Sequence, residues 1–274
     1  MTIYDQMLAV YPQQTEKQQH NARIEVAQQI VLAGLARSDF FSKAAFYGGT
    51  CLRIFHNLQR FSEDMDFSLM QMDEVFRWED YFPYIEREFE ALGRTVTITK
   101  KDKRTFGKVE SAFLKDNTEV VNLQFQTEKS LKIKIEVDIC PPLGFATEQR
   151  LLFQPYSFYT RCVAPSDLFA GKMHALLFRQ WKNRVKGRDW YDFEWYIRNR
   201  IPLHFEHLQE RVRQCNGVEL TKEQFLEMLR AKISVTDIND VRVDVEPFLI
   251  ANPSDLDIWS NEYFGLLADR LTFA

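Results

Sequence analysis

Residues 46–67 read FYGGTCLRIFHNLQRFSEDMDF and join a glycine turn to two closely spaced aspartates. The residues of interest are Gly48, Gly49, Thr50, Ser62, Asp64 and Asp66. In an extended segment side chains alternate between faces, so Asp64 and Asp66 are expected to point the same way, about 6 to 7 Å apart. Two carboxylates on one face form half of a divalent-metal site.

The glycine turn has a complementary property. Glycines let a backbone approach an anion closely, and the start of a helix leaves several N–H groups unpaired. Together with the aspartates, the turn could hold a phosphate beside a metal ion. The alternative is a simple turn with Thr50 as an N-cap and two aspartates on a solvated strand edge. Each half alone favours that alternative, but both halves within about twenty residues favour the site.

Composition indicates a protein with a substantial core. The chain has 274 residues, 45% of them hydrophobic, which is enough for one large domain or two closely packed ones. It shows neither an apolar run of bilayer length nor a basic and then apolar start, so we expect a cytoplasmic protein without a membrane segment. The cysteines, at positions 51, 140, 162 and 215, form no CxxC pair, which argues against disulfides or a zinc knuckle.

Charge is distributed unevenly along the chain. Residues 92–200 hold 20 Lys and Arg against 12 Asp and Glu, a balance of +8, while the remaining residues hold 15 against 27, a balance of −12. A basic middle on an acidic protein suits an anionic substrate that must reach one place. Solvated faces with no ligand can show the same segregation.

Hydrophobic periodicity predicts helices over 20–36 and 74–92, the second kinked or broken at Pro83. Period-two patterns predict antiparallel strands at 95–98, 108–113, 120–125 and 132–139. The last strand places Asp138 on its polar face together with Lys132, Lys134 and Glu136. Asp138 is therefore a candidate third carboxylate for a two-metal site, although a solvated alternating strand explains the same pattern equally well.

The second half is expected to be helical after an irregular aromatic connection at 153–159. A helix is expected after Pro165, with Lys172 on its apolar stripe and directed either to water or to a phosphate. Basic residues crowd 179–188, and Trp181 and Trp190 are candidate stacking surfaces. Asp189 and Asp192 share one face of the next helix. Three or four amphipathic helices are expected over 204–274.

Four segments together resemble one family. They are GGT with RFSEDMDF, KIEVDI at 134–139, DLFAGKMHAL at 167–176 and GRDWYDF at 187–193. In this order they are similar to the motifs of the AbiEii/AbiGii nucleotidyltransferase toxins, a branch of the polymerase-beta-like nucleotidyltransferases. The resemblance covers about residues 46–197. The GGT opening in place of Gly-Ser, and Glu63 between Ser62 and Asp64, are departures from the pattern.

The resemblance implies specific roles. Asp64 and Asp66 would bind metal with Ser62 nearby, Lys172 would contact the nucleotide phosphates, and Asp189, with Asp192 as second candidate, would be needed for activity. Including Asp138, the expected metal ligands for Mg²⁺ or Mn²⁺ are Asp64, Asp66 and Asp138, and the expected nucleotide-binding residues are Gly48, Gly49, Thr50, Ser62, Lys172 and Asp192. Whether Asp138 is ligand or general base stays open.

The expected fold is α+β, with a small nucleotidyltransferase sheet flanked by helices over 1–160 and a helical domain over 161–274 that contributes residues to the cleft. The expected function is transfer of a nucleoside monophosphate from an NTP to an RNA acceptor, the tRNA 3′ end, by a toxin with a cognate antitoxin. It would act in a toxin–antitoxin or phage-defence pair. The alternatives are a protein or small-molecule acceptor, a nucleotide-binding regulator without turnover, and a helical interaction module.

Overall fold

The computed structural model describes residues 1–100, 118–126, 131–179, 185–250 and 253–274. The chain divides into two compact units. Unit 1 comprises Met1–Phe55, Ser62–Pro141 and Thr147–Cys162, and unit 2 comprises His56–Phe61, Pro142–Ala146 and Val163–Ala274. Within the described ranges, every helix is too short or too polar to span a bilayer. The strand expected at 108–113 lies outside these ranges.

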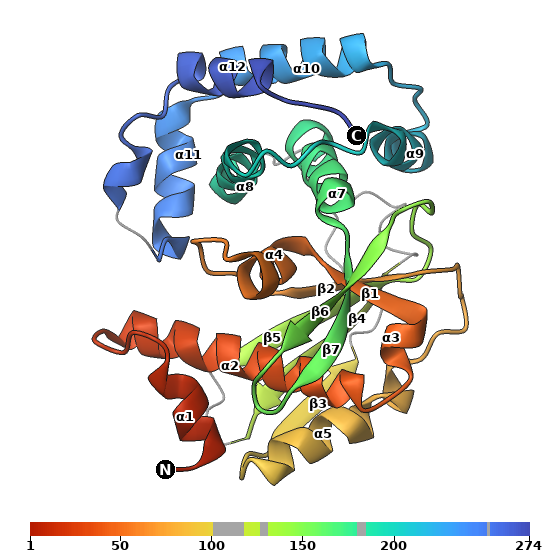
Figure 1. Cartoon of the computed structure of the whole chain (residues 1–274), viewed down its shortest axis with the longest axis vertical. Coiled ribbons are helices and arrows are strands. Elements are labelled where there is room, and N and C mark those ends of the chain that lie inside the picture. The colour runs from red at the N-terminus through yellow and green to blue at the C-terminus, as the bar shows by residue number, and fades with distance from the viewer. Residues whose placement is uncertain (101–117, 127–130, 180–184, 251–252) are drawn as a thin grey trace. The chain divides into compact units, whose positions relative to one another are not determined.

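Unit 1 is built on a mixed sheet (Figure 1). The described strands are β1 (Ala44–Tyr47), β2 (Met65–Leu69), β3 (Val96–Lys100), β4 (Thr118–Phe125), β5 (Lys132–Asp138), β6 (Thr147–Leu152) and β7 (Phe158–Val163). Their order is β3-β4-β5-β2-β1-β7-β6. The antiparallel pairing expected between the strands near 95, 120 and 132 is confirmed, because β4 runs antiparallel to both β3 and β5. The β2–β5 and β1–β7 pairs are parallel.

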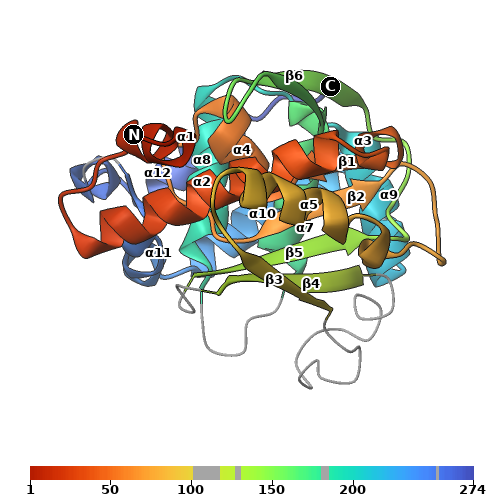
Figure 2. The ribbon, with the colours of Figure 1, turned by 90° about the horizontal axis from the view of Figure 1, so that it is seen from below.

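Helices of unit 1 cover the sheet. They are α1 (Ile3–Ala9), α2 (Glu16–Ala36), α3 (Phe40–Lys43), α4 (Gly48–His56) and α5 (Phe82–Ala91). Helix α2 begins at a capping box between Thr15 and Gln18. It packs against α5, and both lie over the sheet (Figure 2). Gly34 makes this contact possible, since a Cβ there would lie 2.7 Å from the Ile85 Cα.

A cluster of aromatic rings fills the core between the sheet and these elements. Phe40 stacks on Trp78 with 5.5 Å between ring centroids and meets Phe67 of β2 edge-on at 5.0 Å. The strand β5 shows the expected alternation, with Ile133, Ile135 and Val137 buried and its polar residues partly exposed. This alternation fixes which side chains of β5 reach the polar face of the sheet.

The break expected at Pro83 within 74–92 is confirmed, but the part before it is not an α-helix. A 3₁₀ turn, η1 (Trp78–Asp80), precedes α5, because Pro83 favours the first turn of a helix and disfavours its interior. The irregular connection expected at 153–159 is confirmed for residues 153–157, which lie between β6 and β7. Phe158 and Tyr159 belong to β7, and neither strand was predicted. The strand sequences, TEQRLL and FYTRCV, do not alternate apolar and polar residues.

Unit 2 is helical among its described residues. It contains α7 (Pro165–Phe178), α8 (Gly187–Arg198), α9 (Phe205–Asn216), α10 (Lys222–Val235), α11 (Ile238–Val245), η3 (Glu246–Phe248), η4 (Pro253–Leu256) and α12 (Asn261–Asp269). The expected helix after Pro165 and the four amphipathic helices after 204 are confirmed. Trp190 and Phe193 of α8 pack on Phe264 of α12 and form the core.

Unit 2 is expected to lose stability in mild acid through His174. Burial lowers the pKa of this imidazole from its ordinary value near 6.5 to about 4, and Arg211 adds to the shift. The folded state therefore binds fewer protons than the unfolded state between these pH values, so stability is complete above pH 6.5 and falls toward pH 4. The contribution is at most on the order of 3 kcal/mol. Urea unfolding across this range should show a flatter pH dependence for His174→Gln, whereas His20→Gln, at an exposed position, should leave it unchanged.

Candidate functional site

Unit 1 brings the glycine turn directly onto the second aspartate. Strand β1 pairs with β2 so that Tyr47 lies opposite Asp66, and Gly48 follows Tyr47 as the first residue of α4. Gly48 has φ +82°, and a Cβ on it would collide with the carboxylate of Asp66. Glycine is therefore required here both for its backbone conformation and for the space it leaves. The start of α4, with its unpaired N–H groups, lies against the Asp66 side chain.

Thr50 does not act as an N-cap, because α4 begins two residues before it. Its hydroxyl instead donates a hydrogen bond to the carbonyl oxygen of Asp64. Asp64 itself is exposed just ahead of β2, Asp66 is partly exposed within it, and Ser62 is buried. The structure thus gathers Gly48, Thr50, Asp64 and Asp66 at one end of the β1–α4 and β2 segments.

The neighbouring strand β5 places Glu136 beside Asp66, whereas Asp138 lies two residues further along the strand, beside Ser68. In the parallel β2–β5 ladder, Asp66 pairs with Glu136 and Ser68 pairs with Asp138. Paired residues on adjacent strands face the same side, about 5 Å apart. Asp138 also accepts a 3.1 Å hydrogen bond from the Cys140 amide. Alternation places Glu136 and Asp138 on one face of β5, but it does not predict the β2–β5 register that brings Glu136, rather than Asp138, beside Asp66.

Lys134 was also missed. Its ammonium pairs with Glu136 at 2.6 Å. Burial alone would lower the pKa of Lys134, but Glu136, followed by Asp64 and Asp66, raises it above its ordinary value. The carboxylates of Asp64 and Asp66 therefore stabilise the charged form of Lys134. Among the described residues, no three Asp, Glu, His or Cys side chains converge closely enough to hold a metal ion by themselves.

Unit 2 contains a separate cluster of buried charges. Lys172 of α7 donates a 2.7 Å hydrogen bond to Asp189 Oδ1 and lies 2.8 Å from Asp192 Oδ2. Arg60 meets Asp192 through two parallel hydrogen bonds of 2.6 Å each, the geometry in which guanidinium and carboxylate bind most strongly. The side chains of Arg60 and Asp192 are 3% and 0% exposed, and that of Lys172 is 16% exposed. Two cations and two anions thus balance one another in this cluster.

The cations set the ionisation of both aspartates. Burial alone would raise the pKa of Asp192, but Arg60 and then Lys172 hold it below its ordinary value. The pKa of Asp189 is lowered in the same way, against burial, by Lys172 and then Lys186. Burial in turn lowers the pKa of Lys186 to about 8. Lys172 is therefore held at neutral pH by two ionised carboxylates and does not point freely into water.

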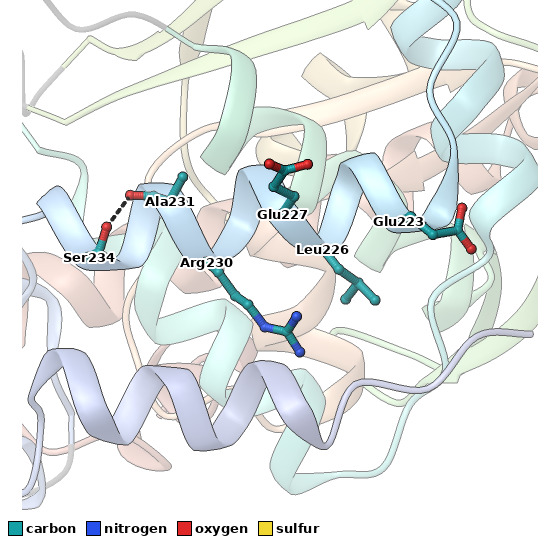
Figure 3. Close-up of a pocket in the computed structure, with 6 residues that line it drawn as sticks. All are labelled: Glu223, Leu226, Glu227, Arg230, Ala231 and Ser234. Atoms are coloured by element: carbon teal, nitrogen blue, oxygen red, sulfur yellow. Dashed lines mark hydrogen bonds between the residues drawn. The ribbon is translucent and has the colours of Figure 1, made fainter.

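The expectation that Trp190 offers a stacking surface is wrong, since this residue is 2% exposed and belongs to the core of unit 2. Trp181, Lys182 and Arg184 lie outside the described residues. A shallow depression along α10 contains none of the expected site residues; Figure 3 shows its lining by Glu223, Leu226, Glu227, Arg230, Ala231 and Ser234.

The match to a known protein family identifies the class of protein to which this chain belongs. Residues 30–261 match the model of the family described as nucleotidyl transferase AbiEii toxin, type IV toxin–antitoxin system. The chain belongs to the AbiEii family. It is therefore a nucleotidyltransferase, and the resemblance inferred from its motifs is confirmed. Type IV membership implies a cognate antitoxin and an NTP substrate.

Solved structures with the same fold are distant in sequence. The AbiEii chain matches MenT4, a nucleotidyltransferase toxin from Mycobacterium tuberculosis, with a TM-score of 0.60 at 15% identity, over 98% of this chain and 87% of that one. JHP933 from Helicobacter pylori matches with a TM-score of 0.54 at 16% identity, over 91% and 90%. A putative nucleotidyltransferase from H. pylori gives 0.53 at 17% identity, over 90% and 92%. No curated protein sequence shows a significant match.

The contact between Gly48 and Asp66 makes a direct prediction for this AbiEii protein. Gly48→Ala should displace the Asp66 carboxylate and reduce nucleotidyl transfer about tenfold or more, the usual cost of misplacing a ligand-supporting group. Gly93→Ala is the matched control, because Gly93 also has a positive φ, +70°, but a Cβ added there would meet no described atom within 4 Å. Both variants should lose about 1 kcal/mol of stability from backbone strain, measured by urea unfolding. Equal activity in the two variants would show that Gly48 serves the backbone alone.

Proposed function

We propose that this protein transfers a nucleoside monophosphate from an NTP to the 3′ end of tRNA, releasing pyrophosphate. The observation that carries the proposal is the contact of the α4 start with the Asp66 carboxylate, beside Asp64. A backbone that can bind an anion suits the phosphates of a nucleoside triphosphate, and two carboxylates beside it suit a divalent cation.

Magnesium or manganese fits these residues. The donors at Asp64, Asp66 and Glu136 are all carboxylate oxygens, which hard divalent cations prefer. Mg²⁺ in such sites is commonly held by one or two carboxylates and by the substrate phosphates. When bound, the ion would stabilise the charge that develops on the phosphates during transfer.

The protein's own groups account for the remaining chemistry. The N–H groups at Gly49 and Thr50 would donate to phosphate oxygens. In the transfer step the acceptor hydroxyl attacks the α-phosphorus, the bond to the pyrophosphate oxygen breaks, and a carboxylate takes the hydroxyl proton. We assign the third carboxylate to Glu136, which is paired with Asp66, and keep Asp138 as the second candidate.

The two acids of α8 receive different roles in this proposal. Both oxygens of Asp192 are engaged by Arg60 and Lys172, so Asp192 would hold the lysine in place. Asp189 pairs with Lys172 through one oxygen, and of the two acids it would be the one needed for activity. Ser62 would support the nucleotide site through its position ahead of Asp64. A role in phage defence and a cytoplasmic location complete the proposal.

The test compares acceptors directly. The protein is incubated with each of the four NTPs labelled at the α-phosphate, together with total cellular RNA and protein, and then with purified tRNA. We expect the label in the tRNA band. Periodate-oxidised tRNA, which lacks the terminal diol, should accept none. Label only in the protein fraction would overturn the RNA acceptor, and nucleotide binding without any transfer would indicate a regulator.

A further inference from the structure

Side chains from two helices hold three successive backbone carbonyls that lead into the acidic pair, Asp64 and Asp66. The last of the three belongs to Asp64. The Gln28 Nε2 on α2 donates 3.0 Å hydrogen bonds to the carbonyl oxygens of both Ser62 and Glu63. The Thr50 hydroxyl on α4 donates to the carbonyl oxygen of Asp64. All of these residues belong to unit 1. The backbone path of residues 62–64 is therefore fixed by side chains that no catalytic role explains.

Gln28 buries a polar oxygen without a hydrogen-bond partner among the described residues. The side chain is fully buried, and the oxygen is Oε1. The orientation of the amide is settled because both contacts are carbonyls, which only its nitrogen can serve. A buried unpaired oxygen offsets much of what the two hydrogen bonds contribute. The remaining effect of Gln28 is on the conformation of residues 62–64.

The two helices that supply these donors are themselves tied together. Arg53 of α4 pairs with Glu25 of α2 at 3.1 Å, and the two side chains are 14% and 7% exposed. Glu25 lies one turn before Gln28, and Arg53 lies one turn after Thr50, so the pair sits beside both donors. The pair therefore joins α2 and α4 next to both donors.

We propose that Gln28 and Thr50 are positioning residues that aim the carboxylates of Asp64 and Asp66. This inference rests on the proposed function, in which these carboxylates bind a divalent cation. Residues 62–64 lead directly into β2, and a carbonyl held on each of them limits rotation of the backbone that carries Asp64. Loss of the donors should leave the fold in place and loosen the acidic pair.

The experiment uses the full chain and the variants Gln28→Met and Thr50→Val, which keep volume and remove the donors. Binding of Mn²⁺ alone is measured by electron paramagnetic resonance, and amide hydrogen exchange is followed over residues 61–67. We expect Mn²⁺ affinity to fall about tenfold or more, as for other groups that orient metal ligands, with faster exchange over this segment. The matched control is Gln29→Met, because Gln29 is the next residue of α2 and donates instead to the Tyr11 hydroxyl.

The outcomes separate this inference from the proposed function. Mn²⁺ affinity and exchange equal to wild type in both variants would overturn the positioning role, whatever the activity. Weakened Mn²⁺ binding in Gln28→Met and Thr50→Val, with Gln29→Met unchanged, supports it even if wild type transfers no nucleotide. Should Gln28→Met fail to fold, Thr50→Val decides the question alone, since its hydroxyl serves one carbonyl at the same segment.

Discussion

Asp192→Leu is expected to destabilise the protein by about 3–5 kcal/mol, because it leaves the buried guanidinium of Arg60 without its carboxylate. Among the described residues, the Arg60 guanidinium would still donate a 3.1 Å hydrogen bond to the carbonyl oxygen of Phe61. The double variant Arg60→Met, Asp192→Leu removes both charges and replaces them with apolar groups of similar volume. It should therefore recover most of the loss, as buried ion pairs commonly do when both members are replaced. Urea unfolding of the two single variants and the double variant measures the coupling.

A surface pair provides the matched control. Arg213 and Glu210 approach to 2.7 Å, but their side chains are 58% and 36% exposed. Glu210→Leu should change stability by about 1 kcal/mol or less. If Asp192→Leu costs no more than Glu210→Leu, the buried cluster around Lys172 is not held together by Arg60 and Asp192.

The sequence predicts those parts of the fold that depend on local pattern. The alternation along β5 identified its buried and polar faces, and the run after Pro165 identified α7, because each pattern reflects the burial of one face. Local pattern does not predict the elements whose structure depends on tertiary contacts. Residues 147–163 form β6 and β7 without strict alternation, and the sheet supplies the hydrogen bonds that their own sequence does not announce.

The candidate site shows the same division. Spacing alone predicts that the glycine turn lies near Asp64 and Asp66, since these residues are close in sequence, and the structure places Gly48 against Asp66. Glu136 was passed over because only the β2–β5 register shows that it faces Asp66. Arg60 was missed because its partner Asp192 is 132 residues away, and nothing in a local window distinguishes a buried arginine from a solvated one.

Asp66→Asn is expected to cause the largest loss of activity. The substitution keeps the size of the side chain and removes its charge, so the contact with Gly48 and the pairing of β2 with β1 and β5 should persist. Nucleotidyl transfer should fall about 10²–10³-fold, the loss that follows removal of one electrostatic group acting on the transition state. Asp80→Asn is the control for a neutralised carboxylate in unit 1, because Asp80 is exposed on η1.

The most direct measurement of the central claim is the initial rate of label transfer from α-labelled NTP to the RNA and protein of a cell extract, counted together. It compares wild type, Asp66→Asn and Asp80→Asn at equal concentrations of folded protein. The predicted result is transfer by wild type and Asp80→Asn at similar rates and a loss of about 10²-fold or more in Asp66→Asn. Equal rates in all three proteins would contradict the assignment of the chemistry to the acidic pair beside the glycine turn.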